Sequence, residues 1–123
     1  VAPVPPAAQA ASPWDDARAR GVGFRAVGNE PGWTVEVDKG AAPPLRAVLD
    51  YGQRQVQVAH TQPFTDPATG VVGFRGNSAD GTRVELTIQR GQCEDASGAS
   101  FDASADLAVG GQHYKGCGRF LFQ

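Results

Sequence analysis

The chain has 123 residues, a formal net charge of −2 and 41% hydrophobic residues. This length suits a single domain, and a weakly acidic chain without a Lys/Arg cluster lacks the basic surface that nucleic-acid binding needs. No apolar run approaches the roughly 18–20 residues of a membrane-spanning helix. Sixteen glycines and nine prolines favour many turns over long helices.

The chain begins with a segment rich in Ala and Pro. Residues 1–13 (VAPVPPAAQAASP) carry no charge and no amphipathic period, which predicts an extended tether before a folded domain at 14–123. Residues 14–20 place acids first and arginines last, which predicts one or two helical turns ended by Gly21. Trp14 is expected either to plug the end of a barrel or to form a platform on which a ligand stacks.

From Val22 the hydrophobic period changes to two, which is typical of strands. In 33–38 the alternation points Trp33, Val35 and Val37 to one face, and in 83–89 it points Val84, Leu86 and Ile88 inward. The other predicted strands are 24–27, 45–49, 54–58, 71–75, 103–109 and 112–122. Segments 63–70 and 93–102 are predicted to be irregular, with hairpin turns at 50–52 and 110–111.

These strands, about eight in number, are joined by short connections with no helix between them. Successive hairpins predict an antiparallel meander, and eight such strands can close into a small barrel with few exposed edges. The predicted fold is therefore all-β, a small antiparallel meander β-barrel with a short N-terminal helical turn. A two-sheet β-sandwich is the alternative.

Cys93 and Cys117 are the only cysteines. A bond between them would tie the last strand to the loop before it, and a disulfide fits an oxidising compartment better than the cytosol. Together with His60 and His113 they show no close pair of ligands of the kind that zinc sites use. We therefore expect a structural disulfide and neither a metal nor a cofactor.

The turn before Trp33 is the leading candidate for a ligand-binding site. Glu30, which follows Asn29, would lie at the rim of the barrel beside an apolar mouth, where ligand sites are common. Asn29 and Trp33 beside it, and Tyr51 of the 50–52 hairpin, are the further candidates for ligand contacts. The alternative is that Glu30 accepts backbone N–H bonds and only holds the turn.

Asp95, Ser97 and His113 contain the ingredients of a nucleophile–base–acid set, although no G-x-S-x-G elbow is present. The simpler interpretation is a structural turn formed by Asp95, Ser97 and Gly98. In such a turn the Asp and Ser side-chain oxygens accept backbone hydrogen bonds.

Two motifs at matching separation resemble a specific family. They are GNEPGW at 28–33 and C-x-D-x-S-G at 93–98, the latter answered by GCGR at 116–119, with a D-Y-G hairpin at 50–52. Over residues 14–122 the chain is similar to bacterial envelope lipoproteins and membrane proteins of unassigned function. Ala96 stands where those relatives carry Met. Any lipid anchor would sit on an N-terminal Cys outside this chain.

The resemblance implies a small β-rich domain in the bacterial periplasm or outer envelope, and it implies no reaction. We therefore expect a non-enzymatic domain that binds a small apolar ligand or an envelope protein. A looser likeness to periplasmic lysozyme-inhibitor barrels makes inhibition of a cell-wall hydrolase the alternative, and a serine-type hydrolase using Ser97 and His113 is the third. An open cavity near Trp33 would favour a ligand, and a filled barrel with a protruding loop would favour an inhibitor.

Overall fold

The computed structural model describes residues 13–29, 32–95 and 98–121, and within them the chain forms one sheet and one short α-helix. The predicted tether at 1–12 lies outside these residues, and Pro13 opens the helix instead of ending the tether. The elements in chain order are α2 (Pro13–Ala19), β1 (Val22–Asn29), β2 (Gly32–Asp38), β3 (Leu45–Leu49), the 3-10 turn η1 (Asp50–Gly52), β4 (Arg54–Val58), β5 (Gln62–Asp66), β6 (Val71–Asn77), β7 (Arg83–Glu94), β8 (Ser100–Val109) and β9 (Gln112–Phe120).

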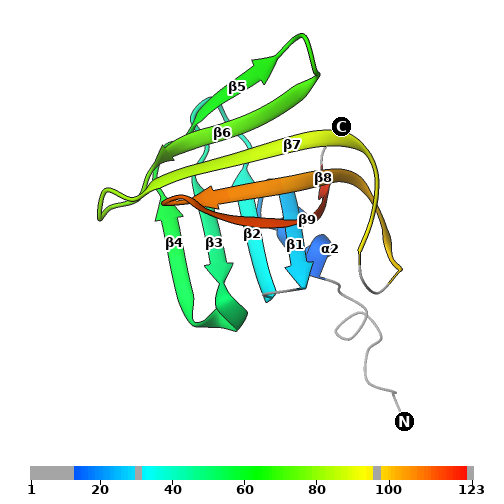
Figure 1. Cartoon of the computed structure of the whole chain (residues 1–123), viewed down its shortest axis with the longest axis horizontal. Coiled ribbons are helices and arrows are strands. Elements are labelled where there is room, and N and C mark those ends of the chain that lie inside the picture. Colours follow the sequence, from blue (N-terminus) through cyan, green and yellow to red (C-terminus); the bar gives the residue numbers. More distant parts are fainter. Residues whose placement is uncertain (1–12, 30–31, 96–97, 122–123) are drawn as a thin grey trace.

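The nine strands form one antiparallel sheet in the order β4-β3-β2-β1-β9-β8-β7-β6-β5. Consecutive strands pair with each other except β4 and β5, and the first strand pairs with the last. The sheet curls into a half-barrel in which β1–β4 cross under the long strands β7–β9 (Figure 1). The predicted all-β antiparallel meander is therefore confirmed, with β4 and β5 as the two edges of the described sheet.

Two segments predicted to be irregular contain strand residues. Gln62–Asp66 forms β5 although it includes Pro63, because an edge strand does not need the N–H that Pro lacks. The ladder between β7 and β8 shifts after Arg90 and then continues with Cys93 opposite Phe101. The prediction of irregular structure at 63–66 and at both ends of 93–102 is therefore wrong, and the sheet has nine strands instead of about eight.

Alternate side chains of the strands fill the concave face of the half-barrel. Trp33, Val35 and Val37 are at most 4% exposed, as their alternation predicts. Val84, Leu86 and Ile88 are equally buried, and the same core includes Phe24, Ala26, Leu45, Ala47, Leu49, Val56, Val58, Ala103, Ala105, Leu107, Val109 and Tyr114. Each large aliphatic side chain buried in this way contributes about 1.5–3 kcal/mol, so burial is the main source of stability.

Strands β1 and β9 approach each other through glycines of β9. A Cβ on Gly116 would lie 2.0 Å from the carbonyl oxygen of Val27, and one on Gly118 would lie 2.6 Å from that of Arg25. Real Cβ atoms do not come so close to backbone atoms, so any side chain here would push the two strands apart. The pairing of the first strand with the last therefore depends on glycine at these positions.

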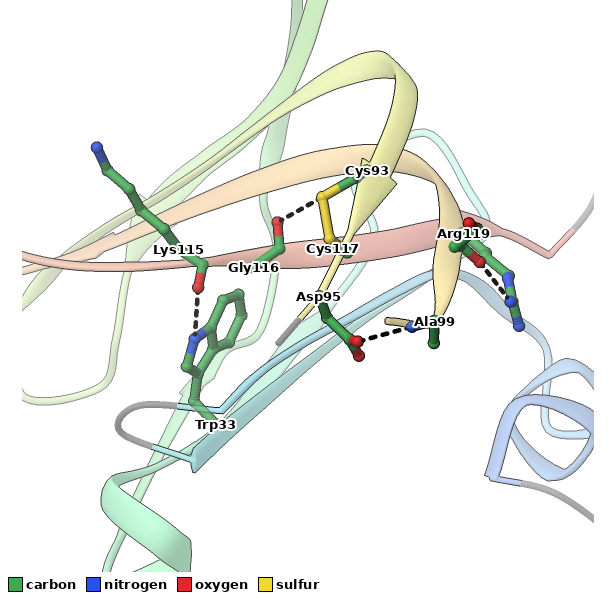
Figure 2. Close-up of a disulfide and its surroundings, with 9 residues drawn as sticks. Trp33, Cys93, Asp95, Ala99, Lys115, Gly116, Cys117 and Arg119 are labelled. Carbon is green, nitrogen blue, oxygen red and sulfur yellow. Dashed lines mark hydrogen bonds between the residues drawn. A yellow bond between two sulfur atoms is a disulfide. The ribbon is translucent and has the colours of Figure 1, made fainter. Parts of the chain in front are cut away.

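Trp33 covers this junction from the concave side. Its indole lies against Gly28, and its Nε1 donates a hydrogen bond of 3.3 Å to the carbonyl oxygen of Lys115 in β9 (Figure 2). The ring also meets Tyr114 edge-on, with 6.3 Å between the centroids. The Tyr114 hydroxyl donates to Asp50, and burial, together with that carboxylate, raises the pKa of the phenol.

The predicted disulfide between Cys93 and Cys117 is confirmed, with 5.7 Å between the two Cα atoms (Figure 2). It joins β7 to β9 across β8 and closes a segment of 24 residues. In the chain-entropy description a loop of this length stabilises the fold by roughly 3 kcal/mol. The bond therefore holds the irregular end of β7 against the junction of β1 and β9.

A pair of glycine substitutions in β1 tests the packing of Trp33. Gly28→Ala would place a Cβ 1.9 Å from the indole Nε1, so we expect a loss of roughly 1–3 kcal/mol in the free energy of unfolding. Gly23→Ala is the matched control, because its Cβ would come close only to the flexible Lys39 side chain, at 3.2 Å from Cγ, and would lie at an ordinary contact distance of 3.6 Å from the Lys39 nitrogen and the Val37 carbonyl oxygen. Urea unfolding should show a change within about 0.5 kcal/mol for the control. Equal losses in both variants would contradict this description of the packing.

Candidate functional site

A groove rich in aromatic side chains runs over the convex side of β1, β2 and β3. Its volume is about 550 Å³, which is within the usual range for ligand sites. Val27, Thr34 and Val48 form part of its floor, and they alternate with the core residues of the same strands. We call it the aromatic groove, and its lining consists of Pro13, Trp14, Arg25, Val27, Gly28, Gly32, Trp33, Thr34, Val48, Tyr51, Gly52, Asp95 and Phe101.

Trp14 of α2 forms one wall of the aromatic groove. Its ring centroid lies 5.6 Å from that of Phe101 in β8. The guanidinium of Arg25 lies 4.7 Å from the Trp14 ring centroid, and that of Arg119 lies 5.1 Å from it. Such cation–π contacts contribute about 0.5–1 kcal/mol each at exposed sites. Trp14 therefore packs on the convex face and does not plug the end of the barrel.

Glu36 holds Arg25 in place beneath Trp14. The Arg25 Nε donates to the Glu36 carboxylate at 3.2 Å, and Arg20 of α2 donates two further hydrogen bonds to it at 3.0 and 3.1 Å. Burial alone would raise the pKa of Glu36, but the hydrogen bonds and charges of these two arginines lower it below 4.5. The carboxylate thus stays ionised and links the helix to the floor of the groove.

Tyr51 forms the opposite wall at an exposed tip. Its side chain is 70% exposed, and its backbone is left-handed with φ 58°, after Asp50 with φ 53°. The ring packs over Gly32, where an added Cβ would lie 2.8 Å from Cδ1. Left-handed backbone in residues other than glycine costs on the order of 1–3 kcal/mol. The fold therefore presents a large side chain at a strained position that glycine would occupy at less cost.

The structure brings together two of the four predicted ligand-contact residues. Trp33 and Tyr51 both border the aromatic groove, although Trp33 is only 4% exposed and belongs mainly to the core. Asn29 ends β1 with its backbone paired to Gly32. The side chain of Asn29 and all of Glu30 lie outside the described residues, so a role for Glu30 stays a prediction.

Asp95 organises the chain between β7 and β8. Its Oδ1 accepts a hydrogen bond of 3.0 Å from the Ala99 N–H (Figure 2), and its own N–H donates to the Ala99 carbonyl. The Gly98 N–H donates to the Asp95 carbonyl, with Gly98 at φ 89°. Asp95 and Gly98 thus form a turn at the side of the groove, while Ser97 lies outside the described residues.

His113 lies at the other end of β8 from Asp95. It pairs with Ala108 in the ladder and its Nδ1 lies 2.9 Å from Asp106 Oδ1, whereas Glu94, next to Asp95, pairs with Ser100. The span from position 100 to 108 is roughly 26 Å of extended strand. The structure therefore does not bring Asp95 and His113 together in one site.

Two features are absent from the described part of the chain. No group of three or more His, Cys, Asp or Glu residues is placed there to hold a metal ion. No helix there has the length and apolar character to cross a bilayer.

Arg25 and Phe101 line the aromatic groove, and the sequence did not reveal either of them as a site residue. Alternation places Arg25 on the outer face, but its partner Trp14 comes from a helix 11 positions earlier, and Phe101 comes from a strand near the other end of the chain. These contacts are tertiary and leave no local pattern. Only the pairing of β1 with β9 brings them together.

Glu36→Gln tests the charged support of the groove. It removes charge-assisted hydrogen bonds, so we expect a loss of roughly 1–3 kcal/mol near neutral pH. Because the pKa of Glu36 is lowered on folding, its contribution is present above about pH 4.5 and is lost as the pH falls through the lowered value. Urea unfolding of the variant and the parent should therefore converge in acid.

Glu85→Gln is the control, since Glu85 has an exposed partner, Arg83, at 3.9 Å. Such pairs contribute about 0–1 kcal/mol, so little change is expected at any pH. If Glu36→Gln costs the same at about pH 7 and about pH 3, the stabilisation does not come from charge.

Comparison with protein-family models, with curated proteins and with solved structures gave no match.

Proposed function

We propose that this chain is a non-enzymatic binding domain of the bacterial cell envelope and that it binds a protein partner in the aromatic groove. The observation that carries the proposal is that three sequence motifs converge on the same groove. Gly28 and Trp33 of the GNEPGW motif, Tyr51 of D-Y-G and Asp95 of C-x-D-x-S-G all border this one groove. If each motif only stabilised its own turn, motifs so far apart in the sequence would not need to border the same surface.

The character of the groove favours a protein over a small apolar ligand. Ligand pockets usually enclose most of the ligand in apolar side chains, whereas this groove is open and includes Arg25, Thr34 and Asp95. The inside of the half-barrel, whose mouth near Trp33 is the place expected for an apolar ligand, is packed with core side chains. Exposed aromatic residues and arginines are enriched where proteins bind each other.

Inhibition of a cell-wall hydrolase is the second candidate, and a specific observation favours it. A filled half-barrel with a protruding tip is the arrangement expected of an inhibitor, and Tyr51 is such a tip at 70% exposure. The Cys93–Cys117 disulfide is compatible with the oxidising periplasm in which those hydrolases act.

Site-specific photo-crosslinking tests the binding surface. A benzophenone amino acid at position 51, in cells of the producing bacterium, should give a discrete crosslinked product. The product should weaken in a Trp14→Ala background, because Trp14 forms the facing wall. The control probe replaces His113, whose side chain is 58% exposed at the far end of β8. Equal products at both positions, or none at position 51, would contradict the proposal.

A lysozyme turnover assay tests the second candidate. The domain should slow turnover at micromolar concentrations, and Tyr51→Ala should weaken inhibition about tenfold or more, as loss of an aromatic anchor does. His113→Ala should inhibit like the parent. If the domain slows no class of lysozyme, inhibition of a cell-wall hydrolase is rejected as its function. The crosslinking result still decides whether the aromatic groove binds a protein partner.

A further inference from the structure

The two edges of the described sheet differ in their protection. β5 contains Pro63 and ends at Asp66, and proline and charge are devices that keep a strand edge from pairing. β4 (RQVQV) contains no Pro, its single charge lies at its first residue, Arg54, and its register with β3 is unbroken over all five residues. β4 is therefore an edge on which another strand can pair.

The nearby turn at 78–82 does not use the edge of β4. At one corner of the curled sheet β6 comes close to β4, since a Cβ on Gly76 of β6 would lie 2.7 Å from Cγ1 of Val58 in β4. Beyond that corner a groove of about 370 Å³ separates residues 54–57 from the turn. The turn bonds internally, since the Ser78 N–H donates to the Thr82 carbonyl and the Gly81 N–H donates to that of Ser78.

β4 is complementary to a second copy of itself. Antiparallel pairing centred on Val56 sets Gln55 opposite Gln57 of the second copy and Arg54 opposite Val58. This register pairs all five residues and keeps the concave-face residues on one side. It also keeps the two arginines at opposite ends, where like charges do not face each other. Registers shifted by one residue in either direction leave part of the strand unpaired.

We propose that two copies of this chain pair through β4 about a two-fold axis and form one continuous antiparallel sheet. The axis of an antiparallel pair stands perpendicular to the sheet, so both aromatic grooves lie on the same convex side. A partner with two binding segments could then engage both grooves and gain avidity. A single strand pair is a small interface, and the dimer is therefore weak. This inference does not depend on what the groove binds.

The dimer is tested by sedimentation equilibrium of the full chain from about 10 µM to about 1 mM, where small interfaces dissociate. The mass should rise from 12.8 kDa towards twice that value. Gln55→Lys combined with Gln57→Lys sets lysines opposite each other twice and should abolish the rise. The corresponding double glutamate variant should also be monomeric, and an equal mixture of the two should form a heterodimer.

Gln62→Lys, on the other edge, is the matched control and should dimerise like the parent. Thermal unfolding of each variant checks that it is folded, since Gln55 and Gln57 are exposed. A parent that stays monomeric up to about 1 mM would overturn the proposal and indicate that the 78–82 turn shields β4. A dimer that tolerates both lysines in β4, or one that Gln62→Lys disrupts, would overturn it equally.

Discussion

The close approach of β1 to β9 is the constraint on which the rest of the structure depends. Gly116 leaves no room for a side chain beside Val27, so the first and last strands pair at the middle of the sheet. That pairing brings Trp33 under the backbone of β9, where it donates to Lys115. It also sets Cys117 at the junction, where the disulfide ties β7 to it. Burial provides most of the stability, while the disulfide adds roughly 3 kcal/mol.

The same pairing determines where binding surfaces arise. Because β1 pairs with β9 in the middle of the sheet, β4 and β5 become its two edge strands. The connection from β4 to β5 therefore lies at the open side of the half-barrel. On the convex side, the junction lets α2 reach β8, so Trp14 packs on Phe101. Glu36 supports this wall by positioning Arg25. Exposed ion pairs usually contribute at most about 1 kcal/mol. The Glu36 side chain is only 15% exposed and accepts hydrogen bonds from both Arg20 and Arg25, so we expect a larger contribution from it.

Much of the fold could be predicted from the sequence, and little of the candidate site. Period-two alternation predicted the strand from Trp33 and the one containing Leu86, with the faces that the structure shows, and the two lone cysteines predicted the disulfide. β5 was missed because residues 63–70 were predicted to be irregular, whereas an edge strand tolerates Pro63. The wall formed by Trp14, Arg25 and Phe101 could not be predicted, because its contacts span the chain and depend on the β1–β9 pairing.

Native-state hydrogen exchange tests the central role of that pairing most directly. The hydrogen-bonded amides between residues 24–27 of β1 and 117–120 of β9 should exchange only through global unfolding. Their opening free energy should equal the free energy of unfolding in denaturant, while amides of the β5–β6 hairpin at the sheet edge should open at lower cost. If the β1–β9 amides exchange through a cheaper local opening while those of β6 and β7 remain protected, the junction is not the element that holds the sheet together.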